Sequence, residues 1–364
     1  MIILDRRLLL SFDWLWFLAL LALSGAGIIA IWSTTYGTSL SPYFGRQVIY
    51  LCVGLVVFVS LLKFDYHLFS DFIGFIYSAG LALLILVFIV GRAVHSNKSW
   101  IDIGFFSFQP SEIVKILTIV ALAKYYSDLD QDYLGLRELV MGGLIVFVPA
   151  LMVVMQKDLG TAVTFLPIYA VITCLAGIRR KHLVAILILV VVMAPVCWFL
   201  LRGYQKGRIE TVFNPASDPQ RLGYHTIQSQ IAVGSGRFLG KGFKQGSQAN
   251  LGFLPARHTD FIFAVLAEER GFVGAMTVLC LFLFVSQRLF RAAREAKDKI
   301  GVMIVAGVLA LFLFHVIINI GMVEGLFPVA GIPLPFLSAG GSSLISFFGA
   351  MGLCMNIWMR RYVN

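Results

Sequence analysis

The chain has 364 residues, of which 59% are hydrophobic and only 13% are charged. Soluble domains carry about a quarter charged residues, so this composition excludes an ordinary soluble protein and indicates a polytopic membrane protein. The formal net charge is +10, but the basic residues fall in loops between apolar segments, so a nucleic-acid partner is not predicted. The five cysteines lie in apolar runs without metal-ligand spacing, so neither a disulfide framework nor a structural metal site is predicted.

Apolar segments with the length of a membrane-spanning helix recur along the chain. Crossing the hydrocarbon core of a bilayer takes roughly 20 mostly apolar residues in a helix. By this criterion ten spans are predicted: Trp14–Trp32, Arg46–Leu62, Phe72–Gly91, Glu112–Tyr126, Glu138–Met155, Thr161–Ile178, His182–Leu201, Phe261–Gln287, Ile300–Val323 and Ser342–Met359. The first follows Arg6 and Arg7 without a small-residue cleavage site, so we expect a retained span rather than a signal peptide. The sequence therefore predicts an all-α membrane protein of about ten helices, with residues 1–364 forming one integral membrane domain.

The distribution of Lys and Arg predicts the orientation of these spans. Basic residues collect in short cytoplasmic loops, and here they are more numerous on the side of both termini, which are therefore predicted to be cytoplasmic. Residues 202–260, between spans seven and eight, then form one long external loop that is itself basic. Either a long loop crosses the membrane whatever its charge, or its cations meet a polyanionic group such as a pyrophosphate at the outer surface.

Asp260 stands where this polar loop runs into an apolar segment. It follows Arg257, His258 and Thr259 directly. A carboxylate at a membrane boundary, beside a histidine and an arginine, is difficult to explain as packing. Asp260 is therefore predicted to be the catalytic residue, with these neighbours next to the substrate.

The span that begins after Asp260 is longer than a bilayer core requires. Either the helix projects or tilts strongly, or Asp260 to Glu268 form a short helix at the membrane surface and the crossing begins near Gly271. Both alternatives leave Glu268, Glu269 and Arg270 in the outer part of the membrane, where charges are costly unless they are paired or face a wet cavity. We expect an ion-paired cluster lining a cavity; the alternative is a purely structural clamp of Arg270 with the two glutamates.

Two other external segments carry polar side chains. Glu112 and Lys115 stand three residues apart near the start of span four, so they can pair on one helix face; Lys115 can instead face the phosphates of a lipid head group. Between spans five and six, Lys157 and Asp158 belong to a short polar loop, where capping of the next helix by Asp158 or Thr161 is the alternative to a role in binding.

The glycine-rich stretch 234–242 lacks the spacing of a nucleotide-binding P-loop. Its backbone amides, together with Lys241 and Lys244, can still approach a phosphate closely. In span nine, His315 and Asn319 stand four residues apart and are predicted to make polar contacts between helices.

Several stretches taken together resemble a known family. They are Phe108 to Glu112 (FQPSE), Asp158 to Thr161 (DLGT), Gly223 to Gly236 (GYHTIQSQIAVGSG), Gly240 to Gly242 (GKG), His258 to Glu269 (HTDFIFAVLAEE), Pro333 to Phe336 (PLPF) and Gly340 to Ser343 (GGSS). In this order they resemble the SEDS family (shape, elongation, division and sporulation), and its elongation branch more than its cell-division branch. The chain departs from the family pattern at Lys157, Arg237 and Ala256.

The resemblance implies a ten-span peptidoglycan glycosyltransferase of the bacterial cytoplasmic (inner) membrane. Such an enzyme polymerises lipid II at the outer face during cell elongation, together with a class B penicillin-binding protein, a transpeptidase, and the elongation machinery. The family's essential aspartate corresponds to Asp260. The residues predicted to bind substrate are Lys115, Lys157, Asp158, Gln228, Lys241, Arg257, His258 and Thr259.

The chemistry of such a reaction agrees with a single external carboxylate. Joining two sugars requires a base that deprotonates the attacking hydroxyl, whereas the diphosphate is already a good leaving group whose charge must be stabilised by cations or by a divalent metal such as magnesium or manganese. No cluster of metal ligands is predicted. Two other functions remain: a transporter that flips lipid II, which predicts substrate-binding charges near the membrane midplane, and a non-catalytic scaffold for the penicillin-binding protein, which would not need Asp260.

Overall fold

The computed structural model of the chain describes residues 10–37, 40–94, 97–103, 106–129, 131, 133–200, 203–213 and 222–362. Arg6, Arg7, Arg202 and Arg221, which entered the charge distribution, lie outside these residues. Helices occupy every predicted span: α2 (Trp14–Thr35), α3 (Pro42–Lys63), α5 (Ile73–Val90), α6 (Pro110–Ser127), α7 (Leu136–Met155), α8 (Leu159–Val163) with α9 (Phe165–Leu175), α10 (Arg180–Leu200), α14 (Ile262–Glu295), α15 (Lys299–Val323) and α16 (Gly341–Met359).

Shorter helices lie between the predicted spans. They are α4 (Tyr66–Asp71), and, in the long segment before α14, α11 (Gly203–Phe213), α12 (Leu222–Ser235) and α13 (Ser247–Asn250). Aspartates begin several helices, because a carboxylate at the N-cap can accept from the free amides of the first turn. Asp13 accepts from Trp16 N at 3.0 Å, and Asp298 accepts from Gly301 N at 2.8 Å.

The described residues include six helices that are long and apolar enough to cross a membrane: α2, α3, α7, α14, α15 and α16. Two shorter apolar segments, Ile73–Ile89 and Leu159–Leu175, follow the same pattern. Large apolar side chains such as Phe75 and Leu283 are exposed on the outer faces of the helices, as expected where acyl chains rather than water surround the protein. The chain is therefore a mostly helical, multi-pass membrane protein, and the count of ten spans stays a prediction.

The expectation of an all-helical chain is wrong between α5 and α6. There β1 (Arg92–Val94), β2 (Asn97–Ile103) and β3 (Phe106–Phe108) form an antiparallel sheet in the order β1-β2-β3, in which Ile101 lies opposite Phe108. The segment is too short and polar to span a membrane, but it is rich in the aromatic and β-branched residues that strands favour. Because the segment has no long apolar run, the sequence predicted a loop there.

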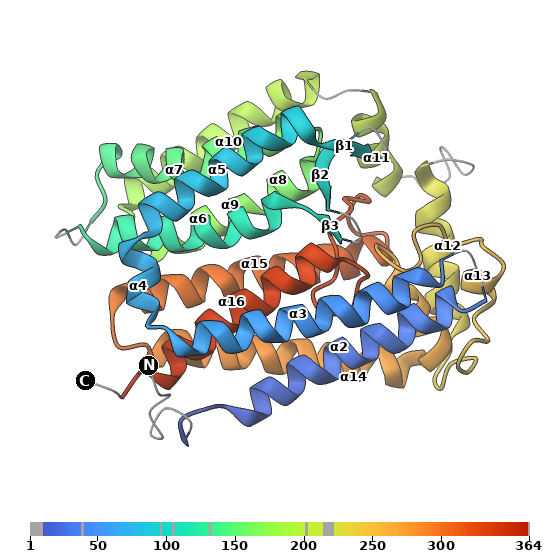
Figure 1. Cartoon of the computed structure of the whole chain (residues 1–364). Helices are drawn as coiled ribbons and strands as arrows, with labels where there is room; N and C mark the ends of the chain where they lie inside the picture. Colours follow the sequence, from blue (N-terminus) through green and yellow to red (C-terminus); the bar gives the residue numbers. More distant parts are fainter. Residues whose placement is uncertain are drawn as a thin grey trace.

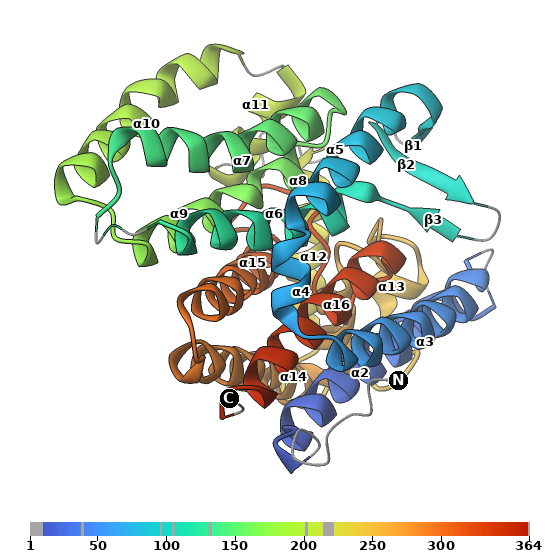
Figure 2. The ribbon, with the colours of Figure 1, turned by 60° about the vertical axis from the view of Figure 1, so that its left-hand side comes forward.

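The helices form two groups with α15 between them (Figures 1 and 2). On one side α15 packs against α14 and α16, and on the other against α6 and α9. Helix α16 is buried along its whole length and packs mainly against α3. The sheet and α11–α13 lie at the same end of the bundle, on the right of Figure 1. Asp260 precedes the first residue of α14, Ile262, by two positions, and we call this end the Asp260 end.

At the opposite end, segments near both ends of the described chain meet. Asp13, before α2, forms an ion pair with Arg288 of α14 at 3.0 Å. Arg360, after α16, pairs with Asp65 at 3.0 Å. The start of α2 and the end of α16 therefore lie at the same end of the bundle, far from the sheet (Figure 1).

Candidate functional site

Asp260 lies in a turn that leads into α14. The amides of Thr259 and Asp260 both donate to the carbonyl of Ala256 at 3.1 Å, which closes the turn one residue before the buried side chain of Phe261. Ala256 takes a left-handed conformation with φ of 47°. The chain thus turns sharply just before α14 and leaves Asp260 half-buried.

Three successive backbone carbonyls of this turn accept hydrogen bonds from other segments. The donors come from α15 and from the segment 330–339 that follows it. The pairs are Ala339 N with His258 O at 2.9 Å, Ser338 Oγ with Thr259 O at 2.6 Å, and Asn319 Nδ2 with Asp260 O at 3.1 Å. The position of the Asp260 backbone is therefore determined by residues that follow it in the chain by more than fifty positions.

The carboxylate of Asp260 faces the same segment 330–339. Gly331 has φ of 67°, and a Cβ placed on Gly331 would lie 3.9 Å from Asp260 Oδ2. Glycine suits this position because the left-handed conformation is costly for residues with a side chain.

A second polar cluster forms around Asp158 in the loop before α8. Asp158 caps α8 by accepting from Thr161 N at 3.1 Å and Thr161 Oγ1 at 2.9 Å, and it accepts from Gln109 Nε2 at 2.9 Å. Burial raises the pKa of Asp158, and the charge of Glu112 adds to this rise, while the bonds from Thr161 and the charge of Lys115 oppose it. The capping role is confirmed, and it leaves the carboxylate close to both charges of α6.

Glu112 and Lys115 form a buried pair inside the bundle. Lys115 Nζ lies 2.9 Å from Glu112 Oε1, and their side chains are 1% and 3% exposed, respectively. Lys115 Nζ also lies 3.3 Å from His315 Nε2. The predicted pairing on one helix face is confirmed, whereas a direct contact of Lys115 with substrate stays a prediction.

The two clusters meet at the segment 330–339. A Cβ on Gly160, two residues after Asp158, would overlap the carbonyl of Ala330, so the start of α8 lies directly against this segment. Asp260 faces it from the other side. Lys115, through His315, and Asp158, through the start of α8, are thus linked to the same segment that Asp260 faces.

The glutamates of α14 do not pair with Arg270, contrary to expectation. Glu268 is fully buried; it accepts from Lys241 Nζ at 2.6 Å and from Gln248 N at 3.1 Å. Glu269 accepts from the hydroxyl of Ser33 on α2. Within the described chain no ion pair joins Arg270 to either glutamate, because its exposed side chain extends toward Phe243 instead.

Of the two alternatives for the long span, a break at Gly271 is the correct one. Gly271 has φ of 65° and ψ of −162° inside α14. The amides freed by the break donate to the glycine-rich stretch, Phe272 N to Arg237 O at 2.8 Å and Val273 N to Phe238 O at 3.2 Å. The short helix before Gly271 carries Asp260 at its start, and the longer part follows.

The glycine-rich stretch 234–242 therefore stabilises the break in α14. The amides of Lys241 and Gly242 donate to the carbonyls of Glu268 and Glu269, both at 3.0 Å. These two amides are thus not available to a phosphate, whereas phosphate binding by the side chains of Lys241 and Lys244 stays a prediction. Lys244 packs its ammonium over the Tyr36 ring, 3.4 Å from the centroid.

The remaining predicted residues lie around the same end. His258 packs against Tyr43 of α3 with ring centroids 4.6 Å apart; burial, followed by the charge of Arg257, lowers its pKa. Arg257 donates to the carbonyl of Ala249. Lys157 is exposed with φ of 67°, and Gln228 is half-buried on α12.

Three polar residues lie closer to Asp260 and the segment 330–339 than the sequence predicted. His315 and Asn319 were expected only as contacts between helices, and Ser338 was not considered. All three are buried and contact the segment 330–339 or the Asp260 turn. The available signal was two polar side chains one helical turn apart in an apolar span, followed by a segment rich in proline and glycine.

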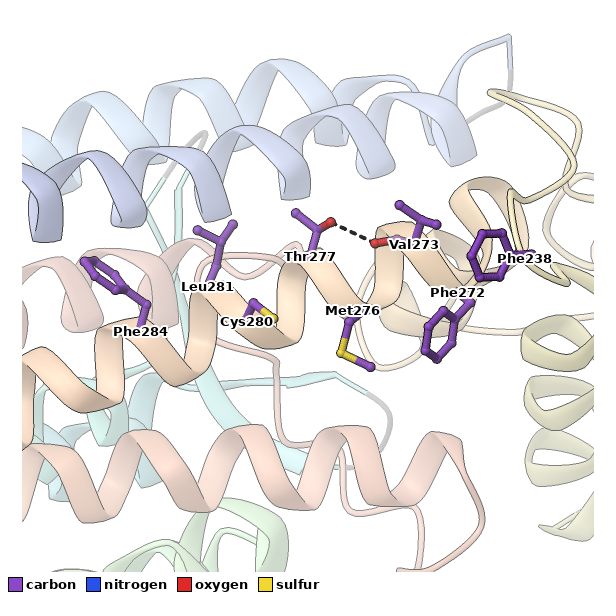
Figure 3. Close-up of a pocket in the computed structure, with 8 residues that line it drawn as sticks. All are labelled: Phe238, Phe272, Val273, Met276, Thr277, Cys280, Leu281 and Phe284. Carbon is purple, nitrogen blue, oxygen red and sulfur yellow. Dashed lines mark hydrogen bonds between the residues drawn. The ribbon is translucent and has the colours of Figure 1, made fainter.

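A groove of about 620 Å³ runs along the outer face of α14, beyond the break (Figure 3). Phe238, Phe272, Met276 and Phe284 are among its lining residues. The lining has no carboxylate and no cation, so it offers no groups for sugar chemistry. Among the described residues, no group of three or more His, Cys, Asp or Glu side chains is placed to hold a metal ion.

Comparisons with known proteins match nearly the whole chain. A family model described as a cell cycle protein and named for FtsW, RodA and SpoVE matches residues 7–363. The peptidoglycan glycosyltransferase MrdB of Escherichia coli K12 is 36% identical over 345 residues, covering 94% of this chain and 92% of MrdB. The peptidoglycan glycosyltransferase RodA of Treponema pallidum is 33% identical over 428 residues, covering 96% of this chain and 98% of RodA.

Solved structures agree with these sequence matches. A chain from a peptidoglycan synthase complex, described as coordinating polymerization and crosslinking, has a TM-score of 0.84 and 28% identity, covering 97% of this chain and 99% of that chain. The crystal structure of RodA from Thermus thermophilus has a TM-score of 0.73 and 25% identity, covering 97% of this chain and 98% of that chain.

Proposed function

The chain belongs to the FtsW/RodA/SpoVE family, and we propose that this peptidoglycan glycosyltransferase uses Asp260 as the general base that joins lipid II units into glycan strands. The observation that carries the proposal is that three groups lie against the segment 330–339: Asp260, the start of α8 next to Asp158, and His315, which contacts Lys115. A half-buried carboxylate on a backbone held by three hydrogen bonds is well placed to act on a bound hydroxyl.

The reaction requires one proton transfer and one displacement. Asp260 removes the proton from the 4-hydroxyl of the acceptor sugar as its oxygen attacks the anomeric carbon of the donor, and the bond from that carbon to the diphosphate breaks. The diphosphate leaves without needing an acid. We propose that Lys157, exposed beside Asp158, and Lys115 stabilise the developing negative charge.

The same proposal includes the membrane setting and the partner. The Asp260 end faces the outside of the bacterial cytoplasmic membrane, with both termini in the cytoplasm, and the enzyme acts during cell elongation. The similarity to a chain of a complex that couples polymerization with crosslinking supports a class B penicillin-binding protein as partner. A flippase is less well supported, because the polar clusters gather at one end of the bundle rather than in matching halves around the midplane.

The test compares purified wild type with Asp260→Asn in polymerising lipid II without another polymerase. Asn keeps the shape of the side chain but cannot accept the proton, so the rate should fall about 10²–10⁴-fold while thermal stability stays unchanged. Asp71→Asn, an exposed carboxylate at the opposite end, is the matched control and should retain full activity. Near-normal polymer from Asp260→Asn would remove Asp260 from the mechanism; an inactive wild type would favour the flippase or the scaffold.

A further inference from the structure

One face of α15 carries two buried polar side chains, His315 and Asn319. They are 1% and 0% exposed, respectively, and stand one helical turn apart in a helix whose other buried residues are apolar or small. Polar side chains inside membrane helices are costly and commonly mark functional positions. His315 contacts Lys115, whereas Asn319 contacts the Asp260 turn.

His315 connects Lys115 to the segment 330–339. Its Nδ1 lies 3.0 Å from Pro333 O, and its Nε2 lies 3.3 Å from Lys115 Nζ. A carbonyl oxygen can only accept and an ammonium can only donate. Both contacts are satisfied together only by the neutral imidazole with its proton on Nδ1, so the partners of His315 determine its tautomer.

Asn319 connects the Asp260 turn to the same segment. Its Nδ2 donates to Asp260 O at 3.1 Å and to Ile332 O at 2.8 Å, so both of its N–H groups are used. Asn319 thus binds the carbonyl of Ile332, and His315 binds the carbonyl of the adjacent Pro333. A leucine in either position would fill the space but would leave buried carbonyls without a donor.

We infer that His315 and Asn319 are positioning residues for glycosyl transfer, which together set the place of the Lys115 ammonium relative to the Asp260 turn. His315 holds the cation and Asn319 holds the base, both against residues 332–333, so one rigid face of α15 determines the separation of the two groups. This inference rests on the proposed role of Asp260. In this proposal neither His315 nor Asn319 touches substrate: His315 acts through Lys115, and Asn319 acts through Asp260.

The first experiment measures polymerisation of lipid II by full-length Asn319→Leu. A displacement of about 1 Å can cost about 10²-fold in rate, so we expect kcat to fall by roughly tenfold to a hundredfold while KM for lipid II changes by less than about threefold. The matched control is Asn356→Leu. Asn356 of α16 donates to Leu61 O at 2.8 Å and to Phe64 O at 2.6 Å at the opposite end of the bundle, so its loss should lower thermal stability but leave kcat of the folded fraction unchanged.

A double mutant separates positioning from general damage. Because Asn319 acts through Asp260, Asn319→Leu should lower the residual activity of Asp260→Asn far less than it lowers that of wild type. An equal factor in both backgrounds, or an unchanged kcat in Asn319→Leu alone, would overturn the positioning role while leaving Asp260 as the base. Near-normal activity of Asp260→Asn itself would instead overturn the proposed function, and this inference with it.

His315 allows a test that does not depend on the folding of Asn319→Leu. An asparagine amide reaches the place of Nδ1 and a glutamine amide the place of Nε2, so His315→Asn keeps the donor to Pro333 O, and His315→Gln keeps the acceptor for Lys115. Since both links are needed, each variant should lower kcat at unchanged KM, and His315→Leu should lower it further. If His315→Leu matches wild type in kcat, His315 has no positioning role.

Discussion

The two ends of the bundle use polar side chains in different ways. At the opposite end, charged side chains pair with one another and are partly exposed, as in Arg360 with Asp65 and His67 between Asp65 and Asp298. At the Asp260 end, three buried polar side chains, His315, Asn319 and Ser338, bind backbone carbonyls of the 258–260 turn and of residues 332–333. Pairs of exposed charges hold helices together, whereas donors directed at a backbone determine where one particular turn lies.

Two buried asparagines make the contrast concrete. Asn356, at the opposite end, donates through Nδ2 and also accepts at Oδ1 from Arg360 Nε at 3.1 Å. Asn319, at the Asp260 end, uses Nδ2 in the same way, but its buried Oδ1 has no hydrogen-bond partner within the described chain. Glu112 Oε2 and His258 Nδ1 share this condition. Because such groups cost stability, the presence of these three beside the Asp260 turn and the Lys115 pair suits a site that receives a polar substrate.

The largest loss of stability should come from breaking the buried pair at the Asp260 end. Lys115→Met removes the ammonium and leaves Glu112 charged and buried, which typically costs about 3–5 kcal/mol. The change is measured as the free energy of unfolding of the purified protein in detergent. Removing both charges, in Glu112→Gln with Lys115→Met, should restore most of the stability, because no unpaired charge remains. If Lys115→Met had the same free energy of unfolding as wild type, the expected cost of leaving Glu112 unpaired would be contradicted.

A smaller loss is expected where the glycine-rich stretch contacts the break in α14. Gly271→Ala places a side chain at φ of 65°, where its Cβ would overlap Gly240 N. A backbone conformation of this kind costs about 1–3 kcal/mol without glycine, and the lost contact adds to it. Gly25→Ala in α2, where a Cβ meets nothing within 4 Å, is the control and should keep or raise the melting temperature. Equal melting temperatures for Gly271→Ala and Gly25→Ala would contradict the need for glycine at the break in α14.

The smallest effect should come from the opposite end and depend on pH. Burial alone would lower the pKa of His67, but its hydrogen bonds to Asp65 and Asp298 raise it overall. Burial likewise acts to raise the pKa of Asp65, yet the bonds to His67 and the charge of Arg360 lower it overall. The stabilisation from His67 is therefore complete below about pH 6.5 and is lost as pH rises through the raised pKa, while that from Asp65 is present above about pH 4.

His67→Gln should therefore lower stability most between about pH 4 and 6.5, and less as pH rises above this range. Because His67 is half exposed, the loss should be only a few tenths of a kcal/mol, read as a difference in melting temperature across a pH series. His182→Gln serves as the control, since His182 of α10 has no ion pair in the described part of the chain. A loss that grows from pH 6 to pH 8 would contradict the raised pKa of His67.

Much of the fold followed from the sequence by itself. Apolar segments predicted the helix in each of the ten expected spans, because a membrane helix satisfies its backbone hydrogen bonds within one segment and its apolar side chains need no particular partner. The shorter helices α4 and α11–α13 were not predicted. The capping of α8 by Asp158 and the pair of Glu112 with Lys115 were local as well. The small sheet was missed because its strands depend on pairing with one another rather than on one apolar run.

Only the tertiary structure decided which distant groups meet. Glu268 takes Lys241 rather than its neighbour Arg270, and Lys115 meets His315 two hundred positions away. The segment 330–339 joins the Asp158 loop to the Asp260 turn. Such partners are chosen by the packing of whole helices, since a buried polar group takes whichever partner the global arrangement brings within hydrogen-bond distance. The sequence by itself determined where the helices and the candidate base lie, and the packing of α15 against α6 and α14 decided what surrounds that base.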